Sequence, residues 1–384
     1  MRILAVTGTR ADWGLLLPVL IRLRDDARFD LRLCATGQHL DPRSPSLEAI
    51  RTDGFEPDHQ IDIQVGEDDS SAAIAKSMGL CSTGIGSVLE KESPDLIMVL
   101  GDRYEMLAAV GAALVARIPV AHLCGGDLTH GAFDDAIRHA ITKMSSIHFV
   151  TNEDAARRVR QMGEPADRVI VSGSPGIDRL MAEPIMSRQA LVSELGLPED
   201  KPFVLISFHP ETLAPEPSAQ LDALLEALKQ CKDLALLLSG SNADPGARAI
   251  DRAFEAMASS RRDAVYFSSL GSRRYLSAMN HAAALVGNSS SGLYEAPSFG
   301  TPTVNIGDRQ AGRLQATSVF DCTADRGAIL TALQAALAWA ENAERTPVRN
   351  PYGDGHAAER IVDALAGIDD PPKLIRKSFE EFAA

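Results

Sequence analysis

Residues 3–20 read ILAVTGTRADWGLLLPVL, and this stretch indicates how the fold begins. A short, mostly apolar run at residues 3–7 is typical of a parallel strand that is buried on both faces. A turn that contains Gly8 follows, and residues 15–23 then have the spacing of an amphipathic helix. The stretch therefore predicts a strand, a turn and a helix, in that order.

The same alternation continues along the chain, which predicts an α/β fold with parallel sheets and helices on both faces. The pattern restarts after a helical, proline-flanked segment at residues 181–202, so we expect two Rossmann-like, doubly wound domains. The expected boundaries are 1–180, 181–365 and a C-terminal tail or helix at 366–384. Ligands of such sheets bind at the carboxyl ends of the strands, here in a cleft between the two domains. The expected strands are residues 3–7, 31–35, 96–100, 120–123, 147–150, 169–171, 203–207, 234–238, 264–267, 284–286 and 303–306.

The composition narrows the class of protein. Of the 384 residues, 45% are hydrophobic and 23% are charged, which excludes a disordered chain or a disulfide-stapled miniprotein. The formal charge of −14 comes from 38 basic and 52 acidic residues. A diffuse acidic surface repels nucleic acids and anionic lipids, so we expect neither as a partner. An anionic small substrate remains open, because it needs only a local cluster of arginines.

The cysteines and the apolar segments predict a cytoplasmic protein. The five cysteines are scattered and form no Cys-x-x-Cys motif, which argues for reduced thiols and against a zinc knuckle. The N-terminal stretch turns polar too early for a signal peptide. The longest apolar stretch, at residues 106–115, is too short to span a bilayer.

Two loops carry groups that favour anions. The turn after the first expected strand presents backbone N–H groups at a helix start, with Arg10 beside them; an ordinary turn with a solvated arginine is equally compatible. After the strand at residues 284–286 comes a run of three serines and a glycine, more than a helix cap needs. We expect this run to cradle a diphosphate and Glu295 to accept hydrogen bonds from a ribose diol. The residues of the cradle are Ser289, Ser290, Ser291 and Gly292.

Further strand ends in the second half add polar groups. Arg309 and Arg313 are four residues apart and can meet a phosphate from one side of a turn, although a solvated loop remains open for Arg313. His209 can donate to a phosphate or act as an acid, or it can be a satisfied structural histidine. Asn242 is placed to bond a base or a ribose.

The densest constellation lies between residues 101 and 143. Asp102 is a candidate acid or base and Arg103 a candidate substrate clamp, although Asp102 alone is also typical of a helix cap. Farther on, Asp134 and Arg138 are an i,i+4 pair that borders the apolar stripe of a helix, where a carboxylate is held in one orientation. A metal site with Asp127 and nearby histidines ranks low, because the spacing matches no His-Glu-x-x-His pattern. We therefore expect no metal.

Taken together, these segments resemble the UDP-N-acetylglucosamine 2-epimerase family, especially its hydrolysing branch, which supplies N-acetylmannosamine for sialic acid synthesis. The resemblance covers nearly the whole chain, in TGTRADWGLL, GDRYE, GGDLTHGAFDDAIRHAITKM, GSPGID, FHPET, GNSSSGLYEAPSFGTP, NIGDRQAGR and NPYGDG. It implies a GT-B fold whose C-terminal helix returns to the first domain, no redox cofactor and a homodimer.

The resemblance also implies a reaction. UDP is eliminated to give a 2-acetamidoglucal, water adds at C1, and a proton reaches C2 on the opposite face. Asp102 and Asp134 match the acid–base carboxylates of the family. Its diphosphate-side positions match Arg10, Arg103, His209, Ser289, Ser290 and Arg309, and its nucleoside-side positions match Asn242 and Glu295.

One position departs from the family pattern. Where members of the sialic acid pathway often have a glutamate, this chain has Cys124, followed by Gly-Gly-Asp127. Three interpretations stay open: Asp127 supplies the missing carboxylate, Asp102 and Asp134 are the whole acid–base pair, or the preferred substrate has changed.

We expect a hydrolysing 2-epimerase that converts UDP-N-acetylglucosamine into N-acetylmannosamine and UDP. The same reaction on UDP-2,4-diacetamido-2,4,6-trideoxyhexose, on the way to legionaminic acid, is the main competing hypothesis. A GT-B glycosyltransferase, a catalytically silent sugar-nucleotide sensor and a reversible, non-hydrolysing epimerase are also compatible with these motifs.

Overall fold

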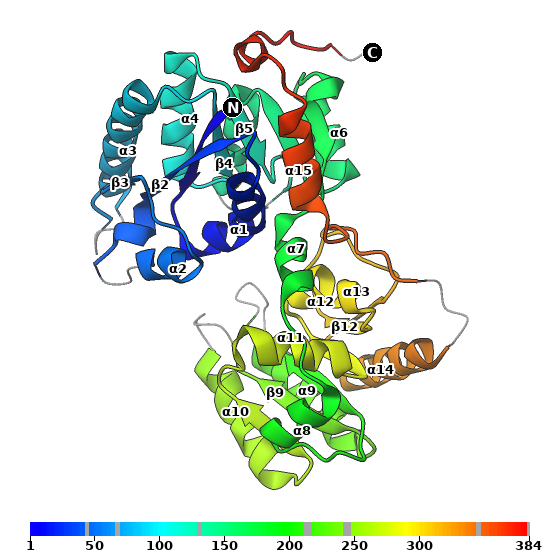
Figure 1. Ribbon diagram of the computed structural model, residues 1–384. Helices are drawn as coiled ribbons and strands as arrows, with labels where there is room; N and C mark the ends of the chain where they lie inside the picture. Colours follow the sequence, from blue (N-terminus) through cyan, green and yellow to red (C-terminus); the bar gives the residue numbers. More distant parts are fainter. Residues whose placement is uncertain are drawn as a thin grey trace. The chain divides into compact units, whose positions relative to one another are not determined.

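The chain forms two compact units (Figure 1). The computed structural model describes residues 1–42, 46–65, 70–128, 133–210, 217–240, 247–342 and 347–381. Unit 1 comprises Met1–Arg179 and Tyr352–Ala384, and unit 2 comprises Leu180–Pro351. The chain thus leaves unit 1 one residue before the boundary expected from the sequence. Residues 352–365, which the sequence analysis placed in the second domain, belong to unit 1 together with the C-terminal segment.

Unit 1 contains a seven-stranded sheet in the order β3-β2-β1-β4-β5-β6-β7, and every strand pair in it is parallel. Its strands are β1 (Arg2–Thr7), β2 (Asp30–Thr36), β3 (His59–Ile61), β4 (Leu96–Leu100), β5 (Val120–Leu123), β6 (Ile147–Val150) and β7 (Val169–Val171). Its helices are α1 (Arg10–Asp25), α2 (Leu47–Thr52), α3 (Ser71–Glu92), α4 (Tyr104–Ala116), α5 (Asp134–Met144), α6 (Glu153–Gln161), α15 (Ala357–Ala366) and the short turns η1 (Gly37–Leu40), η2 (Ala166–Arg168) and η3 (Pro371–Ile375). Helix α7 (Pro175–Ala182) spans the boundary between the units.

Unit 2 repeats this plan with six parallel strands in the order β10-β9-β8-β11-β12-β13. Its strands are β8 (Phe203–Ser207), β9 (Ala235–Ser239), β10 (Ala264–Phe267), β11 (Ala284–Gly287), β12 (Thr303–Ile306) and β13 (Val319–Cys322). Its helices are α8 (Arg188–Leu195), α9 (Pro217–Gln230), α10 (Ala247–Ser260), α11 (Gly271–His281), α12 (Ser291–Tyr294), α13 (Ala296–Phe299) and α14 (Arg326–Glu341). The expected two-domain, doubly wound fold is confirmed.

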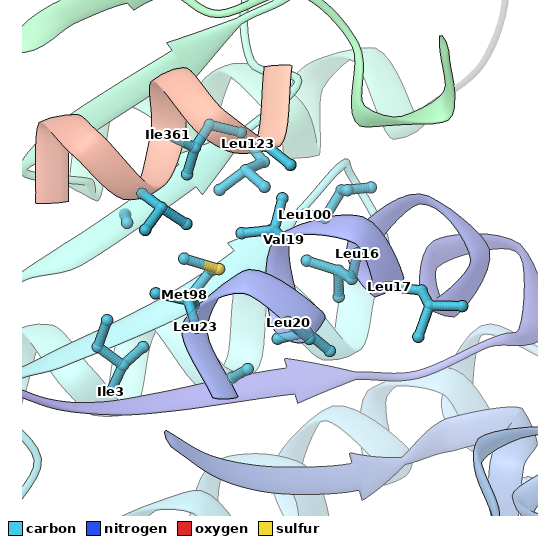
Figure 2. Packing of buried hydrophobic residues seen from close by; sticks show 14 of the residues in the cluster. Ile3, Leu16, Leu17, Val19, Leu20, Leu23, Met98, Leu100, Leu123 and Ile361 are labelled. Carbon is cyan, nitrogen blue, oxygen red and sulfur yellow. The ribbon is translucent and has the colours of Figure 1, made fainter. Parts of the chain in front are cut away.

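Successive side chains of each central strand enter cores on opposite faces, as strand geometry requires. In β1, Ile3 and Ala5 join one core, which α1 and α15 cover, while Leu4 and Val6 join the other. Figure 2 shows the first of these cores, where Leu16, Val19, Leu20 and Leu23 of α1 pack beside Ile361 of α15. Burial on both faces is the reason that these strands read as unbroken apolar runs in the sequence.

The sequence analysis missed two edge strands. Strand β3 has only three residues, and of these only Ile61 is buried. Strand β13 has no fully buried residue. An edge strand pairs on one side only and needs little apolar surface, so neither strand has the pattern by which the central strands were predicted.

Helix α3 is long and apolar enough, by length and composition alone, to cross a membrane. One face of it, with Cys81, Ile85, Val88 and Leu89, belongs to a core that it shares with α4. We therefore interpret α3 as one of the helices that cover the sheet.

The strand order places a topological switch point in each sheet, where loops that leave neighbouring strands diverge. In unit 1 it lies between β1 and β4, and in unit 2 between β8 and β11. The loops after these four strands are those that carry Arg10, Asp102, His209 and the serine run. The fold thus brings the expected site residues of each unit to one edge of its sheet.

Two sets of contacts hold the C-terminal segment to unit 1. The carboxylate of Asp178 accepts the N–H groups of Ala357 and Ala358 at 2.9 and 2.7 Å, which caps the start of α15. Farther along, Lys377 donates to the buried carboxylate of Glu164 at 2.7 Å.

Glu164 has three cationic or imidazole partners and a fully buried side chain. Lys143 lies 2.8 Å and His148 3.0 Å from its carboxylate, in addition to Lys377. Burial alone raises the pKa of Glu164, but the hydrogen bonds of its three partners lower it to about 2.

We predict that Glu164→Gln destabilises the protein at pH 7 by on the order of 3 kcal/mol, because the pKa of this carboxyl falls from 4.5 to about 2 on folding. A lowered pKa stabilises the fold above pH 4.5 and loses that effect as the pH falls toward 2. Chemical unfolding of wild type and variant between pH 7 and pH 2 measures the difference, which should shrink across this window. The exposed Glu153→Gln is the control, and an equal loss in both variants contradicts the account.

Candidate active site

A buried arginine organises the loops of unit 1. Arg138 of α5 is 7% exposed, and its Nη2 bonds the carboxylate of Asp102, which follows β4. Its Nη1 donates to the backbone carbonyl of Asp127 at 2.7 Å and to the carboxylate of Asp135 at 3.4 Å. A planar guanidinium with several donors suits this task, and the contacts hold the Asp102 carboxylate in one orientation.

The predicted contact between Asp134 and Arg138, four residues apart on α5, is wrong. Asp134 is half-buried and contacts neither Arg138 nor Asp102 through a hydrogen bond or ion pair among the described residues. The guanidinium instead reaches toward the loop after β4 and meets Asp135, three residues back on the helix. On a helix, Arg138 can contact the residue three or four positions before it. Its bond to the distant Asp102 determines that the contact is made with Asp135.

The side chain of Asp127 has a different partner from its backbone carbonyl. The hydroxyl of Thr151 donates to both of its carboxylate oxygens, at 3.0 and 3.3 Å. Burial raises the pKa of Asp127. The hydrogen bond from Thr151 and the charge of Arg138 lower this pKa, but by less than burial raises it. A carboxyl with a raised pKa is a better proton donor than an exposed aspartate.

Cys124 lies within electrostatic reach of Asp127, Arg138 and Asp102. Burial raises the pKa of its thiol to about 12, so the thiol stays protonated at neutral pH and provides no carboxylate-like base. Its backbone has a φ of +62°, a left-handed conformation that is uncommon for a residue with a side chain.

His122 ties two of these segments together. One ring nitrogen lies 2.8 Å from the carbonyl oxygen of Gly101, and the other lies 3.1 Å from the hydroxyl of Thr142. Burial lowers the pKa of His122 to about 3, so the ring is neutral. Both nitrogens are engaged within the protein, which disfavours this histidine as a metal ligand; His130 of the same motif lies outside the described residues.

The turn after β1 differs from the expected anion site. The carboxylate of Asp12 accepts the N–H groups of Gly8 at 2.9 Å and Thr9 at 3.1 Å, so these donors are occupied by the protein itself. Burial raises the pKa of Asp12 to about 6, against the opposing hydrogen bonds. Arg10 is exposed on the same turn and remains the group there that can meet an anion.

Arg103 is held by a neighbour that the sequence analysis did not select. Its Nε donates at 2.5 Å to Glu105, whose side chain is fully buried. A Cβ at Gly8 would lie 2.5 Å from the Glu105 carboxylate, so this turn also packs against Glu105.

In unit 2, the four residues of the expected cradle have different roles. The hydroxyl of Ser291 lies 2.7 Å from that of Tyr275 and 2.9 Å from that of Ser289. A Cβ at Gly292 would lie 2.5 Å from Thr303, so this glycine serves packing against β12. Of the three serines, Ser290 is half-buried and its hydroxyl makes no hydrogen bond to the described residues, which leaves it available for a ligand.

Glu295 is available for its expected role. Burial raises the pKa of its carboxyl. The carboxylate makes no hydrogen bond to the residues that the structure describes, although α12 and α13 meet at this residue. It can therefore accept from a ligand hydroxyl.

His209 and Arg309 converge on one residue, Asn288. The side chain of Asn288 bonds the backbone of His209 at 2.7 and 2.9 Å, and its carbonyl accepts from Arg309 at 3.2 Å. Arg313 is exposed, and within the described ranges its side chain makes no hydrogen bond or ion pair with this cluster. Asn242 lies outside the described residues.

Asn288 and Glu105 lie within motifs quoted above, but neither had a predicted role. Asn288 directly precedes Ser289, and Glu105 lies two residues after Arg103. Each acts through hydrogen bonds to a neighbouring loop or side chain. Proximity to Ser289 and Arg103 was the only signal in the sequence.

Comparisons with known proteins identify a family for the chain. Residues 21–366 match the family model described as UDP-N-acetylglucosamine 2-epimerase. The chain is 37% identical over 322 residues to the GDP/UDP-N,N'-diacetylbacillosamine 2-epimerase (hydrolyzing) of Campylobacter jejuni, covering 83% of this chain and 84% of that protein. It is 34% identical to the UDP-N,N'-diacetylbacillosamine 2-epimerase (hydrolyzing) of Legionella pneumophila, covering 98% of both chains.

The fold has solved counterparts. The structure of UDP-GlcNAc 2-epimerase from Neisseria meningitidis bound to UDP-GlcNAc superposes with a TM-score of 0.75 at 22% identity, covering 95% of this chain and 99% of that one. The expected GT-B architecture is thereby confirmed. The chain belongs to the UDP-N-acetylglucosamine 2-epimerase family, in its hydrolysing branch.

Proposed function

We propose that this protein is a hydrolysing 2-epimerase of a UDP-2-acetamido sugar. Elimination of UDP leaves a 2-acetamidoglucal, water adds at C1, and a proton is delivered to C2 on the face opposite to the one it left. The products are UDP and the free sugar with inverted C2.

The observation that carries the proposal is the Asp102 carboxylate held by the buried Arg138. The C2 hydrogen of the sugar is a weak acid, so its removal needs a base at a defined distance and angle as the C1–O bond lengthens. Asp102, at the switch point of the first sheet, is our candidate for that base.

Inversion requires a second acid–base group, because the proton leaves and arrives on different faces. Asp134 is the candidate from the family motif. Asp127 is the other candidate, and its raised pKa suits the delivery of a proton. Both stay predictions, and so does the assignment of Arg10 and Arg103 as diphosphate contacts.

The leaving UDP needs cations and hydrogen-bond donors at its diphosphate. We assign this task in unit 2 to Ser290, His209 and Arg309, and the ribose to Glu295. The unengaged hydroxyl of Ser290 and carboxylate of Glu295 support the assignment. Asn242 as a nucleoside contact and Arg313 as a phosphate contact remain predictions.

Two sugar nucleotides compete as the substrate. UDP-N-acetylglucosamine is the one expected from the sequence, and the matching solved structure is described with that molecule. UDP-2,4-diacetamido-2,4,6-trideoxyhexose is favoured by the diacetylbacillosamine epimerases at 37% and 34% identity. Both share the acetamido group at C2 and the UDP leaving group, so the same residues serve either.

A cytoplasmic location and a homodimer also stay predictions. All five cysteines are free, which suits a reducing compartment.

We predict that the protein releases UDP from one of the two sugar nucleotides without any acceptor, together with the free 2-epimeric sugar. Proton NMR of each incubation identifies the products, and the larger kcat/KM identifies the substrate. Release of a UDP-linked epimer instead indicates the reversible reaction. No turnover of either nucleotide without an added acceptor contradicts the proposal and favours a glycosyltransferase or a sensor.

We predict that Asp102→Asn lowers kcat by about 10²- to 10⁴-fold, because the isosteric amide keeps a contact with Arg138 but accepts no proton. The matched control is Asp135→Asn, which also bonds Arg138 and should change kcat by less than about tenfold. Steady-state assays with the substrate identified above measure both. Equal losses in the two variants would assign Asp102 a structural role only.

A further inference from the structure

We propose that Asn288 is the positioning residue of the diphosphate site, and that it acts by holding His209 and Arg309 in place. This inference rests on the function proposed above. Its side chain is fully buried, so it works through its neighbours and touches no substrate.

The side chain of Asn288 clamps the loop after β8. Its Oδ1 accepts the N–H of His209 at 2.7 Å, and its Nδ2 donates to the carbonyl of His209 at 2.9 Å. Asn288 also donates its own N–H to Ser207 at 3.2 Å. The paired bonds fix the backbone of His209, and because this residue is only 5% exposed its imidazole has little room to rotate.

The carbonyl of Asn288 holds the loop after β12. It accepts from Nη1 of Arg309 at 3.2 Å and from Nε2 of Gln310 at 2.8 Å. Gln310 is 2% exposed, so this contact is shielded from water. Asn288 thus connects the loops that follow β8 and β12, the two strands that flank β11 in the sheet order.

The residue before it explains how Asn288 reaches its partners. Gly287 has a φ of +148°, and a Cβ there would lie 1.9 Å from the carbonyl oxygen of Ser207. Only glycine allows the backbone to approach β8 this closely. The approach places the Asn288 amide against the backbone of His209.

The consequence for binding is specific to the diphosphate. His209 and Arg309 are assigned to the phosphates, so loss of the clamp should weaken UDP but leave uridine nearly unaffected. A general loss of stability, in contrast, weakens both ligands equally. The ratio of the two affinities therefore separates positioning from mere folding.

The experiment measures the Kd of UDP and of uridine by calorimetry on the full chain. Asn288→Ala should weaken UDP by about 10- to 30-fold and uridine by less than about threefold. The control is Asn305→Ala, which removes a buried amide on β12 that bonds Asp321 at 2.7 Å. It should change the UDP-to-uridine ratio by less than about twofold. If Asn288→Ala does not fold, Asn288→Ser takes its place in the experiment, because the serine hydroxyl keeps one of the two bonds to His209.

A second arm tests whether Asn288 acts through its neighbours. In a His209→Ala, Arg309→Ala background, adding Asn288→Ala should change UDP affinity by less than about twofold, because coupled residues are not additive. An additive loss, or equal losses of UDP and uridine, overturns the inference. Failure of the wild type to bind UDP would instead overturn the proposed function, so the two failures are distinguishable.

Discussion

The ion pair between Arg138 and Asp102 is the contact on which the candidate active site depends. It joins α5 to the loop after β4, two segments that are 36 residues apart in the chain. A buried guanidinium is costly unless its donors are satisfied, and here a carbonyl and two carboxylates accept from it. Because the contact is buried and has several partners, Asp102 is presented in one orientation. Cys124 and His122 surround the pair as neutral groups and add no competing charge.

Parallel sheet topology provides the framework for this contact and for its counterpart in unit 2. In each sheet the chain order reverses beside a central strand, and the loops that follow the parallel strands all leave from the same edge of the sheet. In unit 1 the charged side chain of Arg138 joins two such loops. In unit 2 a neutral amide, Asn288, does so and fixes two groups that suit phosphate binding. In the function proposed here, the same architecture supports acid–base chemistry in one unit and anion binding in the other.

The sequence predicted the central strands well because burial on both faces leaves an unbroken apolar run. It did not reveal β3 and β13, whose edge positions demand little apolar surface. Candidate site residues at strand ends were predictable because the carboxyl ends of parallel strands lie at one edge of the sheet. Their partners were not: the choice of Asp135 over Asp134 depends on the distant Asp102, and the capture of the Gly8 amide by Asp12 depends on local turn geometry. Gly292 was predicted only as part of the cradle, and its close packing against Thr303 was not predictable because it depends on the position of β12.

The central claim is that the C2–H bond of the sugar breaks and reforms with solvent protons. The most direct measurement is mass spectrometry and NMR of the free sugar released in D₂O. We expect one carbon-bound deuterium, located at C2, in the sugar formed by the wild type, and formation of this product by Asp102→Asn at a rate about 10²- to 10⁴-fold lower. A released sugar that keeps its original hydrogen at C2 would contradict it.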